Sequence, residues 1–156
     1  MVRWARVAVI LSLLVGAAAG ATPDDAGARL QRARAASVAG HCNEAVPLLE
    51  EIVTNRPGDP AALPAASLLF DCLARQRRTE ELGRRVDQLC AVDQLRRDAG
   101  FAELCGRLRV ALDRVRAEEL GQAGRYEEAA AAYLAIAARR RDDPGYAELL
   151  YNAAIS

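Results

Sequence analysis

The stretch that most constrains the fold is residues 117–137, which read AEELGQAGRYEEAAAAYLAIA. Apolar residues recur at helical spacing on both sides of a break that contains Gly124. After the break, Ala129, Tyr133 and Ile136 fall at i, i+4 and i+7, so they share one face of a helix. Glycine gives the backbone the freedom that a tight helix–helix turn requires. The stretch therefore predicts two antiparallel helices joined by a short turn.

The same stretch resembles the tetratricopeptide repeat (TPR), a 34-residue helix–turn–helix unit. The resemblance is carried, in the order of the repeat, by Gly124, Tyr126, Glu128, Ala129, Tyr133 and Ile136. It implies an all-α fold in which successive hairpins stack as a solenoid. It also implies that the first helices of the hairpins line a concave face, which binds a peptide or a partner helix.

Two earlier segments continue the pattern. Residues 26–59 carry a turn glycine at Gly40 and a closing proline at Pro57, and Asn43 is expected to cap the second helix of this hairpin. Residues 63–96 keep the apolar spacing, but Arg77 stands in place of the turn glycine. The apolar residues expected in the core of these two segments are Leu49, Ile52, Phe70, Leu73, Leu82, Val86 and Leu89.

The third hairpin follows an irregular stretch. Residues 92–100 predict a loop or a short helix, and a longer helix is expected over about 101–123. The apolar stripe of that helix consists of Leu104, Leu108, Leu112, Val115 and Leu120. Residues 147–154 resemble the opening of a further repeat. The predicted fold is therefore a TPR-like helix-hairpin solenoid over residues 28–156, with about three hairpins and a terminal half-repeat.

The first residues predict a secretory signal peptide over 1–21. Arg3 and Arg6 precede an uncharged apolar run over 7–21, which ends in small residues that suit a cleavage site. A run of 15 residues is shorter than the roughly 20 that a membrane span needs. We expect export to the periplasm or the medium, a flexible leader over 22–27 and no stable membrane span after cleavage. An uncleaved anchor is the alternative.

The segment 144–156 is apolar nearly all round, whereas the terminal helix of a solenoid is expected to show a polar outer face. We favour the interpretation that the chain is a truncated copy of a longer array. The alternative is that this edge docks on a partner or associates with a second copy of the chain.

Four cysteines in an exported chain predict disulfides. Two antiparallel helices bring residues together when those residues are equidistant from the turn. Cys42 and Cys72 each lie 15 residues from Pro57, and Cys90 and Cys105 each lie seven residues from the pair at 97–98. The expected pairing is Cys42 with Cys72 and Cys90 with Cys105. Four buried free thiols are the main alternative, and a zinc site is a weaker one because no CxxC spacing is present.

The chain offers little that predicts catalysis. Its only histidine, His41, lies beside Cys42 in a predicted turn, where neighbouring side chains usually diverge. The paired glutamates are adjacent in sequence, so on a helix they point about 100° apart. The sequence has no phosphate-binding, dinucleotide-binding or zinc-protease motif. We therefore expect neither an enzyme nor a bound cofactor or metal.

The net charge does not favour nucleic acid. Arginines and carboxylates balance at 21 each, so the chain lacks the basic excess of a nucleic-acid-binding domain. The expected function is an exported protein–protein interaction or scaffold module of the cell envelope, whose partner is a protein or a peptide. Arg29, Arg32 and Arg116 occupy first-helix positions that are usually apolar, which makes them candidates for contacting acidic partners. The alternative is the N-terminal part of a longer envelope TPR protein with a structural or self-assembly role.

Overall fold

The computed structural model describes residues 25–139 and 145–156, and all regular structure in this part of the chain is helical. The prediction of an all-α fold is thus confirmed for the described residues. The predicted signal peptide and residues 22–24 of the predicted leader lie outside them. The helices are α1 (Ala26–Val38), α2 (Cys42–Asn55), α3 (Ala62–Arg75), α4 (Thr79–Leu89), α5 (Asp93–Arg96), α6 (Ala99–Gln122), α7 (Tyr126–Arg139) and α8 (Tyr146–Ile155).

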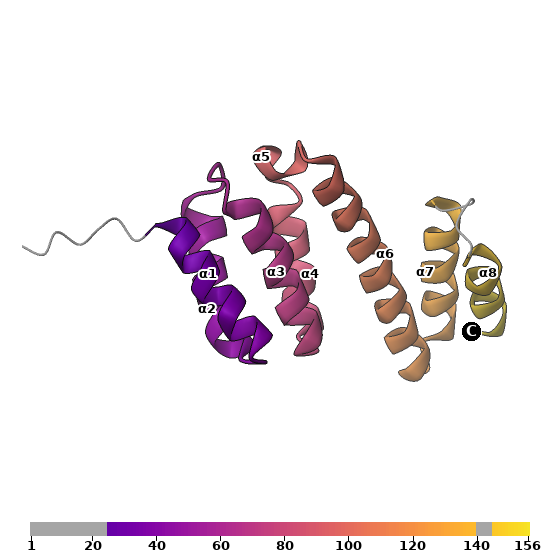
Figure 1. Cartoon of the computed structure of the whole chain (residues 1–156). Helices are drawn as coiled ribbons and strands as arrows, with labels where there is room; N and C mark the ends of the chain where they lie inside the picture. Colours follow the sequence, from indigo (N-terminus) through magenta and orange to yellow (C-terminus); the bar gives the residue numbers. More distant parts are fainter. Residues whose placement is uncertain (1–24, 140–144) are drawn as a thin grey trace, which may run out of the picture.

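The long helices form a row of antiparallel neighbours (Figure 1). Close packing joins α1 to α2, α2 to α3, α6 to α7 and α7 to α8, and α1 also contacts α3. The short helix α5 lies at the upper edge of the row in Figure 1, between the end of α4 and the start of α6. At 24 residues, α6 is the longest of the described helices. Helix α1 begins at Ala26, two residues before the predicted start of the domain, because Asp25 caps it by accepting a hydrogen bond from the Gly27 N–H at 3.1 Å.

Three of the turns between antiparallel helices share one backbone conformation. Each has a residue in the left-handed region: Gly40 (φ 83°), Arg77 (φ 55°) and Gly124 (φ 75°). The residue after it donates to the carbonyl five positions earlier, at 2.8 Å from His41 to Ala36, 3.0 Å from Arg78 to Leu73 and 2.9 Å from Arg125 to Leu120. This is the Schellman arrangement, which satisfies carbonyls at the end of a helix. The turn that lacks glycine therefore keeps the geometry of the other two.

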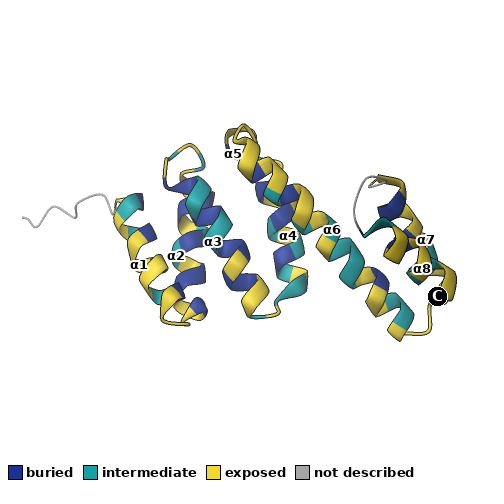
Figure 2. Cartoon of the chain, turned by 45° about the vertical axis from the view of Figure 1, so that its right-hand side comes forward, coloured by how far each residue is buried: buried dark blue, intermediate teal, exposed yellow. Residues whose placement is uncertain are grey.

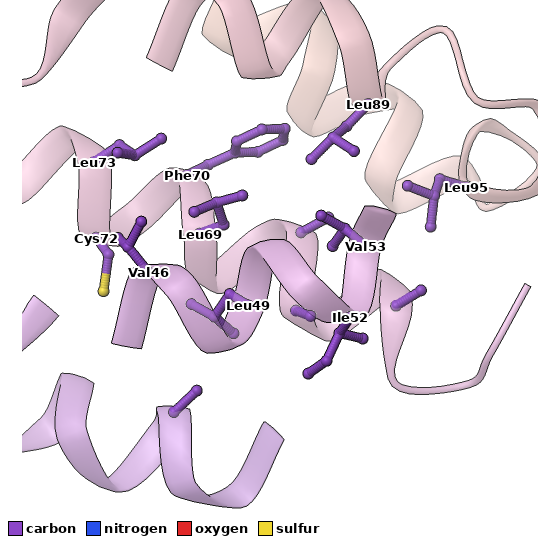
Figure 3. Packing of buried hydrophobic residues seen from close by; sticks show 14 of the residues in the cluster. Val46, Leu49, Ile52, Val53, Leu69, Phe70, Cys72, Leu73, Leu89 and Leu95 are labelled. Carbon is purple, nitrogen blue, oxygen red and sulfur yellow. The ribbon is translucent and has the colours of Figure 1, made fainter. Parts of the chain in front are cut away.

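The first two hairpins share one hydrophobic cluster, which we call the first cluster. Figure 3 shows α2 and α3 side chains meeting there, with Leu89 from α4 and Leu95 from α5 reaching the same cluster. Leu49, Leu69 and Leu73 are completely buried. All the apolar residues predicted for the core of these hairpins are buried, because they recur at helical spacing on faces that meet.

Helix α6 belongs to two clusters. Leu104, Leu108 and Leu112 are half-buried against the first cluster. The second cluster, which α6 forms with α7 and α8, consists of Ala117, Tyr133, Ile136, Ala137 and Leu149. Figure 2 shows α6 as largely intermediate or exposed, in contrast to the buried faces of α2 and α3. The predicted stripe of α6 is thus not fully buried, because the helix departs from α4 along its length.

Polar side chains connect neighbouring helices in the first two hairpins. Ser37 on α1 is a buried polar residue, and Arg75 on α3 donates to both its carbonyl oxygen, at 3.3 Å, and its hydroxyl. Arg85 on α4 forms an ion pair with Glu50 on α2. The prediction that Asn43 caps α2 is wrong: the exposed His41 precedes the helix without a side-chain cap, and the Asn43 Oδ1 accepts a hydrogen bond from Gln76 at 2.6 Å.

The four cysteines come together in the predicted pairs. The Cα–Cα distance is 5.3 Å for Cys42 and Cys72 and 6.0 Å for Cys90 and Cys105, and both values lie in the range of disulfides. The first pair joins α2 to α3. The second joins the end of α4 to the second turn of α6.

The replacement Arg77→Gly should raise the free energy of unfolding by about 1 kcal/mol. A side chain costs roughly that much in the left-handed region, and glycine removes the cost. Among the described residues the Arg77 side chain forms no ion pair or hydrogen bond, so no contact is lost. Denaturant unfolding measures the change, and an unchanged or lowered midpoint would contradict it. As a control, Gly124→Ala should lower stability by a similar amount, although the added Cβ meets no atom within 4 Å.

The oxidised protein should contain no free thiol. Purified without reductant and unfolded in denaturant, it is expected to react with no thiol reagent, since each of the two pairs is at bonding distance. Peptide mapping should then recover one link between positions 42 and 72 and another between positions 90 and 105. Four reactive thiols, or links that cross the two pairs, would rule out this pairing.

Candidate functional site

The candidate site is the space between α4 and α6. At one end of this space, which we call the fixed end, the two helices are cross-linked. The pair Cys90–Cys105 connects the two helices there. Phe70 on α3 stacks on Phe101 of α6 with ring centroids 6.0 Å apart, and Leu95 on α5 is buried in the same cluster. These contacts hold the first two turns of α6 close to α3 and α4.

The start of α6 is also set by its cap. The Asp98 carboxylate accepts a hydrogen bond from the Phe101 N–H at 2.8 Å, which satisfies one of the unpaired N–H groups of the first turn. The cap and the disulfide pair together determine where α6 begins. Beyond Cys105, no further disulfide fixes the position of α6 among the described residues.

The two helices diverge away from this end (Figure 1). Near the fixed end, the Asp87 carboxylate of α4 and the Arg109 guanidinium of α6 lie 3.9 Å apart. Seven residues further along each helix, Glu80 on α4 and Arg116 on α6 occupy the corresponding antiparallel positions. Both line the same cavity, yet the two form no ion pair with each other. Charged groups of α4 and α6 thus pair near the fixed end and not at these two positions.

The resulting groove has a volume of about 410 Å³. Its apolar members are Leu112 and Val115, which are half-buried on α6. Gly83 lies opposite them on α4, and a Cβ built at this position meets no atom within 4 Å. The full lining is Thr79, Glu80, Gly83, Asp87, Arg109, Leu112, Asp113, Val115, Arg116 and Glu119. We call this cavity the α4–α6 groove.

The three arginines proposed from the sequence as partner contacts do not share a surface. Arg29 on α1 forms an ion pair with Glu51 on α2, and its side chain is only 14% exposed. Arg32 is exposed on α1, and α2, α3 and α4 lie between α1 and α6 in the row. Arg116 alone lines the α4–α6 groove. Of the candidate contacts, only Arg116 thus lies at the candidate site.

Leu112 and Val115 were predicted as part of the apolar stripe of α6, and the other residues of the groove were not singled out from the sequence. Glu80 and Glu119 belong to adjacent glutamate pairs that looked like ordinary solvent-exposed faces. One signal was available: Gly83 interrupts a helix in which glycine is unfavourable by roughly 0.5–1 kcal/mol relative to alanine. Such a residue indicates a place where α4 presents no side chain toward its neighbour.

The remaining expectations can be compared with the described part of the chain. No group of three or more potential metal ligands occurs within residues 25–139 and 145–156. In the same ranges, no helix combines the length and the apolar character that crossing a membrane requires. No protein-family model, no curated protein and no solved structure matches this chain.

Removing the Cys90–Cys105 link should loosen α6 selectively. We expect Cys90→Ser/Cys105→Ser to accelerate amide hydrogen exchange in α5 and in the first three turns of α6, because the remaining contacts between α4 and α6 are few. The matched variant Cys42→Ser/Cys72→Ser should act instead on α2 and α3. Hydrogen exchange read by mass spectrometry distinguishes the two. Equal protection of α6 in both variants would mean that the link does not hold the fixed end of the groove.

Proposed function

We propose that this chain is an exported, TPR-like interaction module that holds a segment of a partner protein in the α4–α6 groove. The observation that carries the proposal is the separation of α6 from α4. The pairs α1–α2, α2–α3, α6–α7 and α7–α8 pack closely in the described chain, whereas α4 and α6 diverge from a cross-linked end and leave a cavity between them.

The size of the groove suits a short polypeptide segment. A volume of about 410 Å³ falls within the range of ordinary ligand sites. The lining residues 109–119 of α6 extend over about 15 Å at 1.5 Å per residue. An extended chain covers that length with roughly four residues. The groove therefore has the length of a short extended segment.

Export and repeat architecture are supported by separate observations. The two cysteine pairs at disulfide distance fit an oxidising compartment, as does the signal-peptide pattern of residues 1–21. The repeated Schellman turns and the alternation of antiparallel helices fit a hairpin solenoid. In this role the chain binds its partner without catalysing a reaction, and it needs no cofactor.

A structural role through the 144–156 segment is the second candidate. On α8, Tyr151 is 64% exposed and Ile155 is 65% exposed, although Leu149 on the same helix is fully covered by the second cluster. A second copy of the chain could cover these side chains. Sedimentation velocity at increasing concentration separates the candidates: a concentration-dependent shift that Tyr151→Ser abolishes favours self-assembly, and a constant monomer favours the binding module.

Site-specific photo-cross-linking in the cell envelope tests the binding function. We expect p-benzoylphenylalanine at position 83 on α4, and separately at position 116 on α6, to cross-link one and the same partner protein. The two positions lie on opposite walls of the groove, so only a molecule between them is reached from both. Mass spectrometry of the cross-linked species identifies the partner.

The matched control places the same residue at position 58. Gly58 lies in the turn between α2 and α3, and a side chain added there also meets no atom within 4 Å. Cross-linking of the same partner from position 58 would show that contact is not specific to the groove. The absence of any common product from positions 83 and 116 would refute the groove as the binding site.

A further inference from the structure

We infer that the α4–α6 groove selects an extended segment in which basic side chains flank an apolar one, an inference that rests on the proposed binding function. The partner is identified here by its charge and shape.

The lining is acidic in sum. It contains the carboxylates of Glu80, Asp87, Asp113 and Glu119, against the guanidinium groups of Arg109 and Arg116. Over the whole chain the arginines and carboxylates are equal in number, so the net charge is zero. The groove therefore differs from the average surface by an excess of negative charge.

Two of the four carboxylates are already engaged. Asp87 lies within ion-pair distance of Arg109, at 3.9 Å, and Asp113 accepts a hydrogen bond from Arg139 of α7 at 3.1 Å. The carboxylates of Glu80 and Glu119 form no ion pair or hydrogen bond with other described residues. They come from opposite walls, Glu80 from the first turn of α4 and Glu119 from the last turn of α6.

The unengaged carboxylates lie at the wide end of the groove, and the apolar residues lie between the two ends. Leu112 and Val115 are between Arg109, near the fixed end, and Glu119, near the open end. An apolar side chain of the partner can cover Leu112 and Val115, and a neighbouring basic side chain then reaches Glu80 or Glu119. In an extended segment the two neighbours of an apolar side chain both point to the side opposite to it. When the apolar side chain covers Leu112 and Val115 of α6, its basic neighbours therefore face α4, which carries Glu80, and the charge of Glu119 attracts them across the open end.

From the sequence, Arg116 is a candidate for contacting acidic partners, but the carboxylates around it do not favour such a partner. It is one guanidinium beside two unengaged carboxylates, so an acidic segment would meet net repulsion at the open end. Arg77 and Arg84 border a separate hollow at the α3–α4 turn, which they share with Glu80, and they are not part of the groove lining. The charge of the groove itself thus favours a basic partner.

The test uses three model pentapeptides as probes: Ser-Arg-Leu-Arg-Ser, the charge-reversed Ser-Glu-Leu-Glu-Ser and the neutral Ser-Gln-Leu-Gln-Ser, all with blocked ends. Each is titrated into the oxidised, ¹⁵N-labelled protein, and amide chemical shifts are followed. We expect the basic peptide to shift the amides at positions 83, 112 and 115 and the acidic peptide to leave them unchanged. Affinity for the basic peptide should fall with added salt, because the carboxylates concerned are exposed.

Two matched double variants locate the effect. Glu80→Gln/Glu119→Gln should weaken binding of the basic peptide about 3- to 10-fold, the effect of losing two exposed charge contacts. The control Glu44→Gln/Glu127→Gln removes the same net charge from exposed positions outside the groove and should leave affinity unchanged. Equal weakening by both variants would show non-specific attraction and overturn the inference.

The outcomes also separate this inference from the proposed function. Binding of the acidic or neutral peptide in preference to the basic one would overturn the charge preference. A partner cross-linked from positions 83 and 116 would in that case leave the binding function standing. If no peptide shifts the groove amides and no common partner is cross-linked, both the inference and the proposed function fail.

Discussion

The attachment of α6 at one end only is the constraint on which the rest of this structure depends. Three contacts hold the first turns of α6 against the first two hairpins. They are the Asp98 cap, the Cys90–Cys105 pair and the stacking of Phe101 on Phe70. From Val110 onward the helix also contributes to the second cluster with α7 and α8. Because one helix serves two clusters, it cannot lie flat on α4 along its whole length. The groove is the geometric result of that division.

Local order could be read from the sequence because it depends on short-range rules. Helical spacing identified the buried faces of α2, α3 and α7, and equidistance from a turn identified both cysteine pairs. The angle between α4 and α6 could not be read in this way. It depends on how α5 and the stacked rings direct α6, and no spacing rule records such a direction. The half-buried state of Leu112 and Val115 follows from that angle.

The residues of the candidate site also fall into those that the local sequence pattern identifies and those that depend on how the helices are arranged. Arg116 was noticed because it breaks an apolar pattern within one helix, which is a property of local sequence. Glu80 and Glu119 become significant only once α4 and α6 face each other across a cavity. Arg29 broke the pattern equally, yet its partner proved to be Glu51 within the same hairpin. A departure from periodicity thus indicates where polar contacts occur without indicating whether they are internal or external.

The spacing of the three left-handed turn residues along the chain shows how regular the stack of hairpins is. Positions 40 and 77 are 37 residues apart, whereas 77 and 124 are 47 apart. The additional ten residues are accommodated by α5 and by the greater length of α6, so the third hairpin enters the row out of phase with the first two. In a regular repeat protein all interfaces between hairpins are equivalent. Here the discontinuity makes one interface unlike the others, and that interface contains the α4–α6 groove.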